Sequence, residues 1–233
     1  MAEEIRDRLA RVRERIERAA QRAGRKAEDV SLIAVSKTID PPAIQQAVDA
    51  GIRDLGENRV QEGADKISQV TGDVLRWHLI GHLQSNKARL AIRSFSVIQT
   101  IDSSALAARL ERIAEEEARH LAVLIQVKLG DELTKAGADE SELSEIVATL
   151  DWGRYLGLRG LMAIPPFFES PEDTRPHFRR LRTTLDKLNA GRSPEHKLTE
   201  LSMGMSHDFE VAIEEGATLV RVGTAIFGER QKA

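Results

Sequence analysis

The first 25 residues alternate apolar and charged positions in a pattern typical of an amphipathic helix. Apolar residues recur at spacings of four and three, at Ile5, Leu9, Val12, Ile16 and Ala19. Glutamates balance the arginines between them, which disfavours the alternative of a basic helix lying on a membrane. One face of this helix is therefore expected to pack on the protein, and the other to face water.

After Gly24 the pattern changes to short apolar runs separated by helix-like segments, as expected for β-α units with a parallel sheet. Two of the helix-like segments, Pro41–Ala50 and Ser103–Ala118, follow residues that are common at helix starts. Eight runs predict strands, at Leu32–Ser36, Arg53–Leu55, Trp77–Ile80, Val97–Ile101, Val123–Val127, Gly157–Ala163, Leu198–Ser202 and Thr218–Val222.

Eight β-α units in 233 residues predict an α/β fold, a compact (β/α)8 barrel of the TIM type with an additional N-terminal helix. A doubly wound open sheet is the alternative. No Gly/Ser-rich or Pro-rich linker divides the chain, so residues 1–233 are expected to form a single domain. The longest loop is predicted at Ile164–Pro171. Its prolines fix an extended path, and its two phenylalanines are available to cover a neighbouring part of the protein.

Composition narrows the classes of function. The formal net charge of -3 and the pI near 6.1 provide no basic field, so nucleic acid is not expected as a partner. The absence of cysteine excludes disulfides, thiolate metal sites and cysteine nucleophiles. Neither a signal peptide nor a run of about 20 apolar residues is present, so a cytoplasmic location without membrane attachment is expected.

The first predicted strand is followed by Lys37, which barrel geometry would place at the mouth where barrel enzymes carry their working residues. An amine beside an apolar wall can lose its proton and form a Schiff base with an aldehyde. An exposed lysine without function is the alternative, because such lysines are abundant.

The turns after the last two predicted strands have the composition of phosphate sites. One is Ser202–Ser206 and the other lies within Arg221–Gly228; glycines allow close backbone approach, and hydroxyls and amides can bind an anion. Arg221 shares a strand face with Leu219 and should point into the mouth, or else form a structural ion pair. Barrel closure would bring both turns beside Lys37, where an aldehyde that carries a phosphate would fit.

Longer motifs run through the whole chain. They are Ala34–Lys37, Gly56–Glu62, Trp77–Lys87, Gly160–Pro165, Ser202–Asp208 and Arg221–Gly228. In combination they resemble the pyridoxal phosphate homeostasis protein family, whose members are similar to the barrel domain of alanine racemase. The resemblance extends from the first helix almost to the C-terminus.

The resemblance implies a site for pyridoxal 5'-phosphate, held as an internal aldimine on Lys37. Ser206, with the backbone of Gly223 and Thr224, would hold the phosphate, and Arg221 would face the pyridine nitrogen, where a permanent cation discourages ring protonation. The remaining residues that the resemblance assigns to the cofactor side are Asn58, Ser202 and Met203. No catalytic residue and no metal ligand is assigned.

One segment departs from the family pattern. Lys128 stands where members often carry asparagine, although Glu132, Lys135 and Gly137 still fit. Lys135 is interpreted either as a second amine near the mouth or, preferably, as a solvated side chain.

His78 and His82 are spaced four apart, as metal ligands can be. They straddle a predicted strand end without a carboxylate at ligand spacing, so ordinary hydrogen-bonded positions are expected instead.

Three functions are compatible with the sequence. The resemblance favours a non-catalytic monomer that carries pyridoxal phosphate, buffers its level and hands it to apoenzymes. An amino-acid racemase or related pyridoxal-phosphate enzyme is second, disfavoured because the only tyrosine, Tyr155, would lie at the end of the barrel away from Lys37 and leave no second base. A barrel aldolase that uses Lys37 on a sugar phosphate is third.

Overall fold

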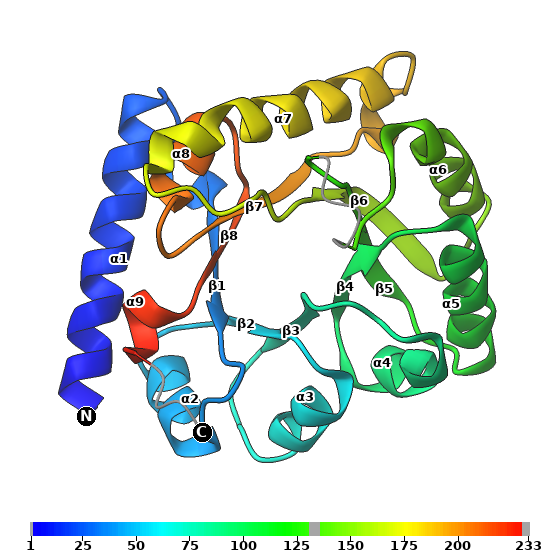
Figure 1. The fold of residues 1–233 in the computed structure, drawn as a ribbon. Coiled ribbons are helices and arrows are strands. Elements are labelled where there is room, and N and C mark those ends of the chain that lie inside the picture. Colours follow the sequence, from blue (N-terminus) through cyan, green and yellow to red (C-terminus); the bar gives the residue numbers. More distant parts are fainter. Residues whose placement is uncertain (1, 131–135, 230–233) are drawn as a thin grey trace.

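The computed structural model describes residues 2–130 and 136–229, and eight parallel strands in this part of the chain close into one barrel in sequence order (Figure 1). The strands are β1 Ser31–Val35, β2 Asp54–Glu57, β3 Arg76–Leu79, β4 Val97–Ile101, β5 Leu121–Gln126, β6 Leu156–Met162, β7 Glu200–Met205 and β8 Leu219–Val222. The predicted (β/α)8 barrel is confirmed, and the doubly wound alternative is wrong because β1 pairs with β8.

Helices surround the barrel and bury their apolar faces against it. They are α1 Ala2–Arg22, α2 Pro41–Asp49, α3 Val60–Ile67, α4 Ala88–Ser94, α5 Ser104–Glu116, α6 Leu143–Asp151, α7 Arg175–Asn189, α8 Phe209–Glu214 and α9 Thr224–Phe227. Short 3-10 helices lie at Ala27–Asp29, Ser85–Lys87, Glu140–Glu142, Pro171–Thr174 and Pro194–His196. None of these helices has both the length and the apolar character that crossing a bilayer requires, as far as the structure describes them.

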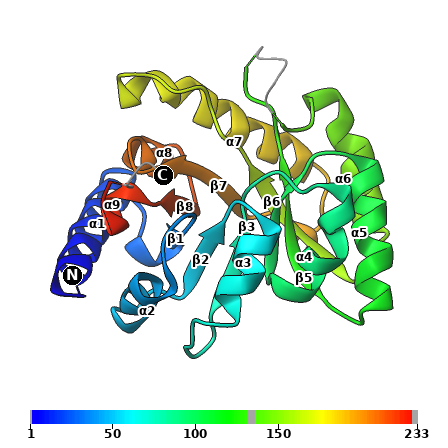
Figure 2. The ribbon, with the colours of Figure 1, turned by 60° about the horizontal axis from the view of Figure 1, so that its bottom comes forward.

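The additional N-terminal helix is confirmed, and its predicted apolar face is the buried one. Ile5, Leu9, Val12, Ile16 and Ala19 are all at most 6% exposed. Through this face α1 contacts α2, α8 and α9, so it covers the side of the barrel where the first and last strands meet (Figure 2). The predicted helix starts are also confirmed, since Asp40 caps α2 by accepting from Ala43 N.

Two strands extend further toward the mouth than predicted. β2 continues through Gly56 to Glu57, and β7 continues to Met205 beyond the predicted end at Ser202. In β7 the sequence analysis had interpreted Gly204 as part of a turn. Gly204 has a φ of +89°, and an added Cβ would lie 2.6 Å from the Ala212 Cβ, so this glycine lets β7 pass close under α8.

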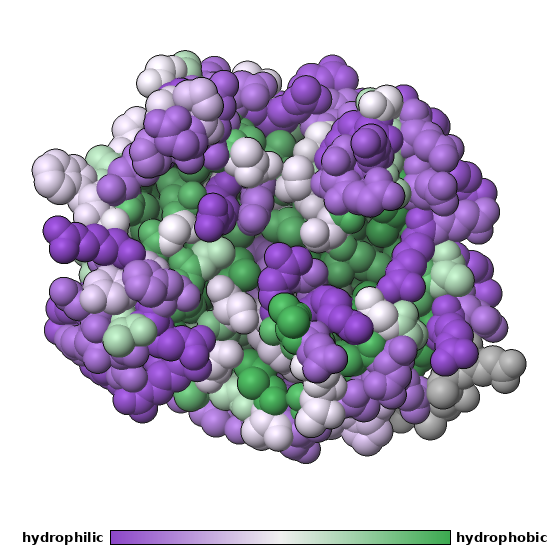
Figure 3. All heavy atoms as spheres, turned by 180° about the vertical axis from the view of Figure 1, so that it is seen from behind, coloured by the Kyte–Doolittle hydropathy of each residue, from purple (hydrophilic) through white to green (hydrophobic). Residues whose placement is uncertain are grey.

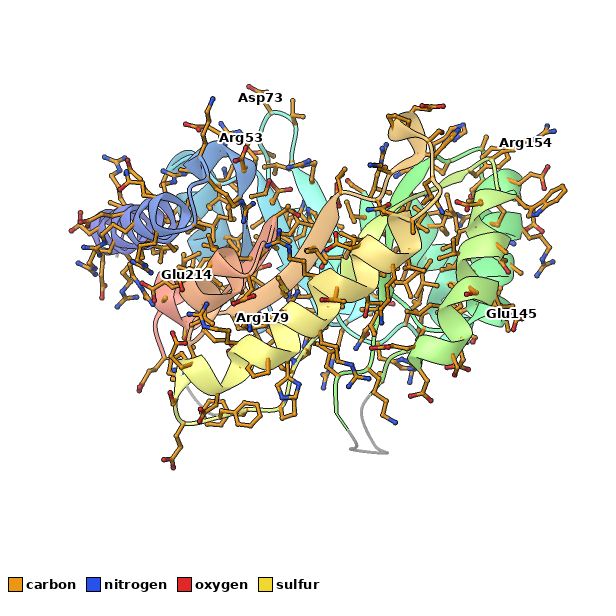
Figure 4. All side chains as sticks on the ribbon, turned by 90° about the horizontal axis from the view of Figure 1, so that it is seen from above. Arg53, Asp73, Glu145, Arg154, Arg179 and Glu214 are labelled. Atoms are coloured by element: carbon orange, nitrogen blue, oxygen red, sulfur yellow. The ribbon has the colours of Figure 1, made fainter. Side chains whose placement is uncertain are left out.

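Closure of the barrel sets the register that positions the site. β1 and β8 are parallel neighbours, with Ile33 opposite Arg221 and Ala34 opposite Val222. The loops that follow β1 and β8 therefore emerge side by side at the same end. The opposite end carries the residues that precede the strands, among them Arg53, Asp73 and Arg154, which lie along one edge in Figure 4. Figure 3 shows that opposite face, where hydrophilic side chains dominate the rim.

Candidate functional site

A cavity of about 590 Å³ opens at the end of the barrel where the strands terminate. Its volume falls within the roughly 300–1,000 Å³ that is usual for small-molecule sites. Its walls are Val35, Lys37, Asn58, Ile80, Gly81, His82, Gln126, Ala136, Ile164, Phe167, Met205, Ser206, His207, Arg221, Gly223 and Thr224. Six of the eight residues predicted from the sequence are in this wall, and Ser202 and Met203 are not.

Lys37 lies in a tight turn just beyond the end of β1. The turn is closed by the hydrogen bond from Ile39 N to Ser36 O, at 2.9 Å. Thr38 has a φ of +64°, a left-handed conformation that is costly for a β-branched residue and needs support from its surroundings.

That support is a buried charged group on β2 and α3. Lys66 Nζ donates to Ser36 O at 2.7 Å, to Glu57 Oε1 at 2.9 Å and to Glu62 Oε1 at 2.7 Å. Ser36 Oγ donates to Glu57 Oε1 at 2.6 Å, and Thr38 N donates to Glu62 Oε1 at 2.6 Å. Both residues that flank Lys37 are therefore fixed by the same three charged side chains, which we call the Lys66 cluster (Glu57, Glu62 and Lys66).

The pKa values of the two carboxylates of the Lys66 cluster are shifted in opposite directions. Burial raises the pKa of Glu57 above the usual range, and the hydrogen bonds from Ser36 and Lys66 oppose this shift without cancelling it. Burial also works to raise the pKa of the more exposed Glu62, but the hydrogen bonds from Lys66 and Thr38 outweigh it and lower that pKa. In the part of the chain that the structure describes, Glu57 Oε2 is buried without a hydrogen-bond partner, so of the two carboxylates Glu57 is the one whose charge is more costly.

Next to Lys37 in the cavity wall, the turns after β7 and β8 are joined directly. Gly223 N donates to Ser206 Oγ at 3.1 Å, which confirms that the two predicted turns meet. Asp208 stabilises the β7 turn, since its Oδ1 accepts from Met205 N at 2.7 Å. Burial raises the pKa of Asp208, although the Met205 N–H and the charge of Arg221 act in the opposite direction.

Arg221 forms the floor of the cavity and is only 3% exposed. Nη1 donates to Ser202 Oγ at 2.6 Å and Nη2 donates to Ala163 O at 2.8 Å. Burial lowers the pKa of Arg221 to about 10, opposed by Asp208, so the side chain remains a cation at neutral pH. The alternative of an ion pair does not hold within residues 2–130 and 136–229, where Arg221 has no salt-bridge partner.

Ser202 and Met203 contribute in other ways than the sequence suggested. Ser202 is fully buried beneath the cavity and holds Arg221, because strand alternation turns its side chain into the barrel. Met203 points the other way and packs in the hydrophobic core with the surrounding helices. Its side chain therefore does not reach the cavity wall.

Three buried polar residues lie below Ser202, and the sequence analysis assigned none of them to the site. Ser202 Oγ lies 2.6 Å from Gln99 Oε1, Gln99 Nε2 lies 2.9 Å from His78 Nδ1, and His78 Nε2 lies 2.8 Å from Asp54 Oδ1. The available signal was the presence of polar residues inside predicted strands, Asp54 in Arg53–Leu55 and Gln99 in Val97–Ile101. His78 is hydrogen-bonded as expected, and its side chain is buried in the barrel interior.

The rim of the cavity is more exposed to solvent than its floor. Phe167 is 78% exposed and lies 5.5 Å from the His207 ring, so the predicted loop after β6 does place an aromatic residue over the mouth. His82 lies 3.5 Å from Asp102. Within the described ranges no group of three His, Asp or Glu side chains could hold a metal ion.

The segment that departs from the family pattern lies beside this rim. Lys128 N donates to Ala138 O, and Gln126 Nε2 donates to Ala136 O, so both ends of the segment are joined. An added Cβ at Gly137 would lie 2.9 Å from Lys128 N, which explains the glycine. Glu132 and Lys135 lie outside the described residues.

Comparison with known proteins agrees with this geometry. The alanine racemase N-terminal domain family matches residues 8–231. Alanine racemase from Clostridium difficile has the same barrel, with a TM-score of 0.74, although it is 17% identical and this chain covers 60% of it. At that identity the likeness concerns the fold. The fold and the cavity thus define a barrel of the alanine racemase N-terminal type.

More similar proteins define the family. The pyridoxal phosphate homeostasis proteins of Aquifex aeolicus and Escherichia coli K12 are each 45% identical to this chain, over 97% and 95% of it and 98% and 95% of their own lengths. PipY of Synechococcus elongatus, solved with PLP bound, is 43% identical with a TM-score of 0.84, and the match covers 96% of this chain and all of that one. The chain belongs to the pyridoxal phosphate homeostasis protein family.

Proposed function

We propose that this protein binds pyridoxal 5'-phosphate, with Lys37 joined to its aldehyde as a Schiff base. The observation that carries the proposal is that Lys37 and the Ser206–Gly223 turn line one cavity of about 590 Å³, brought together by the pairing of β1 with β8. An amine and an anion-binding turn in one cavity fit an aldehyde that carries a phosphate. PipY, solved with PLP bound, is 43% identical and supports the same ligand.

Each wall of the cavity has a role in this proposal. Ser206, with the backbone of Gly223 and Thr224, holds the phosphate, and Asn58 contributes to the cofactor side of the wall. Arg221 faces the pyridine nitrogen. Because its guanidinium is already a cation, it disfavours protonation of that nitrogen and leaves the bound cofactor a weak electron sink.

A carrier role without significant catalysis follows from the same geometry. Two-base racemisation needs a second proton-transfer group opposite Lys37. Tyr155, the only tyrosine in the sequence, precedes β6 at the far end of the barrel and stacks on His120 at 4.9 Å. We propose that the whole chain is one cytoplasmic, monomeric domain that buffers pyridoxal phosphate and supplies it to apoenzymes, as the names of its relatives suggest.

The decisive experiment compares absorption spectra of the purified protein before and after borohydride, followed by peptide mapping of the modified lysine. Lys37→Ala is expected to abolish the visible Schiff-base absorption and leave the far-UV circular dichroism unchanged. Lys128→Ala, two residues beyond Gln126 of the cavity wall, is the matched control and should keep the absorption. Survival of the absorption in Lys37→Ala would show that another lysine is the anchor.

Two further measurements test the role proposed for Arg221 and the carrier role without significant catalysis. Arg221→Glu is expected to shift the visible spectrum and its pH dependence, because ring protonation becomes easier; an unchanged titration would show that Arg221 does not face the nitrogen. Turnover of L- and D-amino acids at about 1 per second or faster, a rate typical of enzymes, would replace the carrier role with an enzymatic one.

A further inference from the structure

Five buried polar side chains from five different strands form one continuous chain of hydrogen bonds through the barrel interior. They are Asp54, His78, Gln99, Ser202 and Arg221, from β2, β3, β4, β7 and β8, and each is at most 6% exposed. The four successive contacts measure 2.8, 2.9, 2.6 and 2.6 Å. The chain starts at the end of the barrel opposite the cavity and ends at the cavity floor.

The far end of the chain fixes the protonation of His78. Burial would raise the pKa of Asp54, but the hydrogen bonds from His78 and Arg76 outweigh it, and the pKa lies below its usual range. Asp54 is therefore an ionised carboxylate that can only accept. Because His78 Nε2 contacts Asp54 Oδ1 at 2.8 Å, Nε2 must carry a proton and donate it.

The cavity end of the chain leads to the same assignment. Arg221 can only donate, so Ser202 Oγ accepts from Nη1 and its own proton goes to Gln99 Oε1. Gln99 then presents its amide N–H to His78 Nδ1, which must accept. The Asp54 end requires a proton on Nε2 and the Gln99 end requires a bare Nδ1, so together they give the His78 tautomer protonated on Nε2 alone, in which every donor along the chain meets an acceptor.

We propose that His78 and Gln99 are positioning residues for Arg221, holding its guanidinium in the one orientation that serves the bound cofactor; this rests on the proposed function. Among residues 2–130 and 136–229, the hydrogen-bond partners that orient Arg221 are the neutral groups of Ser202 and Ala163. If His78 Nδ1 is lost as an acceptor, Gln99 can turn over and point its amide N–H at Ser202. The Ser202 hydroxyl is then left with donors on both sides, and its contact with Arg221 weakens.

Two substitutions of His78 separate positioning from packing. His78→Asn retains a carbonyl oxygen at the place of Nδ1, which can accept from Gln99, and loses the contact to Asp54. His78→Gln fills more of the histidine volume and can still reach Asp54, but it has no acceptor at the place of Nδ1. If the side chain mattered only for packing or stability, Gln would be the milder substitution.

The experiment measures pyridoxal phosphate affinity and the position of the visible absorption band in the two variants. We expect His78→Gln to weaken binding about tenfold, the loss of roughly one buried hydrogen bond, and to shift the band. His78→Asn should stay within about twofold of wild type with an unshifted band. The reverse order, or equal effects, would overturn the inference. Thr184→Val, which removes a buried hydroxyl bonded to Arg180 O outside the barrel, is the control and should change neither quantity.

A second readout needs neither cofactor nor variant. Nitrogen NMR of the wild-type protein with labelled histidine should show His78 neutral, with the proton on Nε2 and a bare Nδ1. A proton on Nδ1 would overturn the inference. If wild-type protein shows no Schiff-base absorption, the proposed function fails; if it shows the absorption while His78→Gln behaves as wild type, only the inference fails.

Discussion

The two halves of the site rest on supports of opposite character. Lys37 lies in a turn held by the Lys66 cluster, in which one cation bridges two carboxylates. Arg221 is held by neutral groups, with the nearest carboxylate of its hydrogen-bond chain, Asp54, four contacts away. An ionic support tolerates small shifts of its members, because attraction between charges varies slowly with angle. A chain of neutral hydrogen bonds demands alignment at every link.

The ionic support of the Lys37 turn and the neutral support of Arg221 meet different structural needs. The Lys37 turn is strained at Thr38 and needs strong support, which charged hydrogen bonds provide. The role proposed for Arg221 requires it to keep its own charge, and a carboxylate bonded directly to it would neutralise that charge. The cation is therefore oriented by Ser202 and Ala163 without being neutralised.

The largest expected effect comes from breaking the ionic support. Lys66→Met leaves Glu57 and Glu62 without their shared cation, and we expect the free energy of unfolding to fall by about 3–5 kcal/mol, measured by urea denaturation. The double substitution Glu57→Gln with Lys66→Met should recover part of this loss. A loss below about 1 kcal/mol in Lys66→Met would show that the cluster is not a significant support.

A smaller effect is expected at the far end of the neutral chain. Asp54→Asn loses the ionic fork to Arg76, at 2.7 and 2.8 Å, but can still accept from His78, and we expect a loss of about 2 kcal/mol at pH 7. Since the folded pKa of Asp54 lies below the unfolded value of about 3.9, this stability is present above that value and is lost as the pH falls through the folded pKa. Unfolding measured from pH 7 down to acid should show wild type and variant converging. Curves that stay parallel would contradict the lowered pKa.

The Ser36 hydroxyl is expected to affect both the stability of the protein and the position of Lys37, and its removal allows the two effects to be measured separately. Ser36→Ala removes the donor to Glu57 Oε1, which still accepts from Lys66, and we expect about 1 kcal/mol of destabilisation in thermal or urea unfolding. Pyridoxal phosphate should then bind more slowly, because the turn that carries Lys37 loses one of its ties. Unchanged binding kinetics would show that Lys66 alone sets the turn.

The smallest effect is expected at an exposed ion pair that serves neither support. Asp151→Asn breaks the pair with Arg192 at 2.8 Å, and the free energy of unfolding should change by at most about 1 kcal/mol. Ligand binding should be unaffected. A loss as large as that of Lys66→Met would mean that charge pairs in this protein contribute equally whether buried or exposed.

The two supports also differ in how far the sequence reveals them. The Lys66 cluster is local, since all its members lie between Ser36 and Lys66, and Glu57 and Glu62 stand in a motif that the sequence analysis singled out without a role for either. The neutral chain joins residues as distant as Gln99 and Ser202, which no local spacing connects. Apolar periodicity was sufficient for the barrel and its order, because each β-α unit is local and closure follows from their number.

The side-chain partners inside the barrel could not be predicted in the same way. Which inward-facing residues meet depends on the stagger of the strands, and the register shifts between β4 and β5 and between β7 and β8 leave no periodic signal. The same limit explains Met203, whose outward direction depends on where β7 begins and ends. Lys37, Ser206 and Gly223 were predictable because they follow strand ends, where position alone decides that they meet.

The pairing of β1 with β8 also has a consequence for biosynthesis. A ribosome makes Lys37 early and the Ser206–Gly223 turn late, so an emerging chain contains the amine long before the anion-binding turn that completes its pocket. Nascent or prematurely terminated chains consequently lack a finished pocket. Under the proposed function, loading with a small aldehyde therefore requires the last step of barrel closure, and only chains that have completed that step bind it.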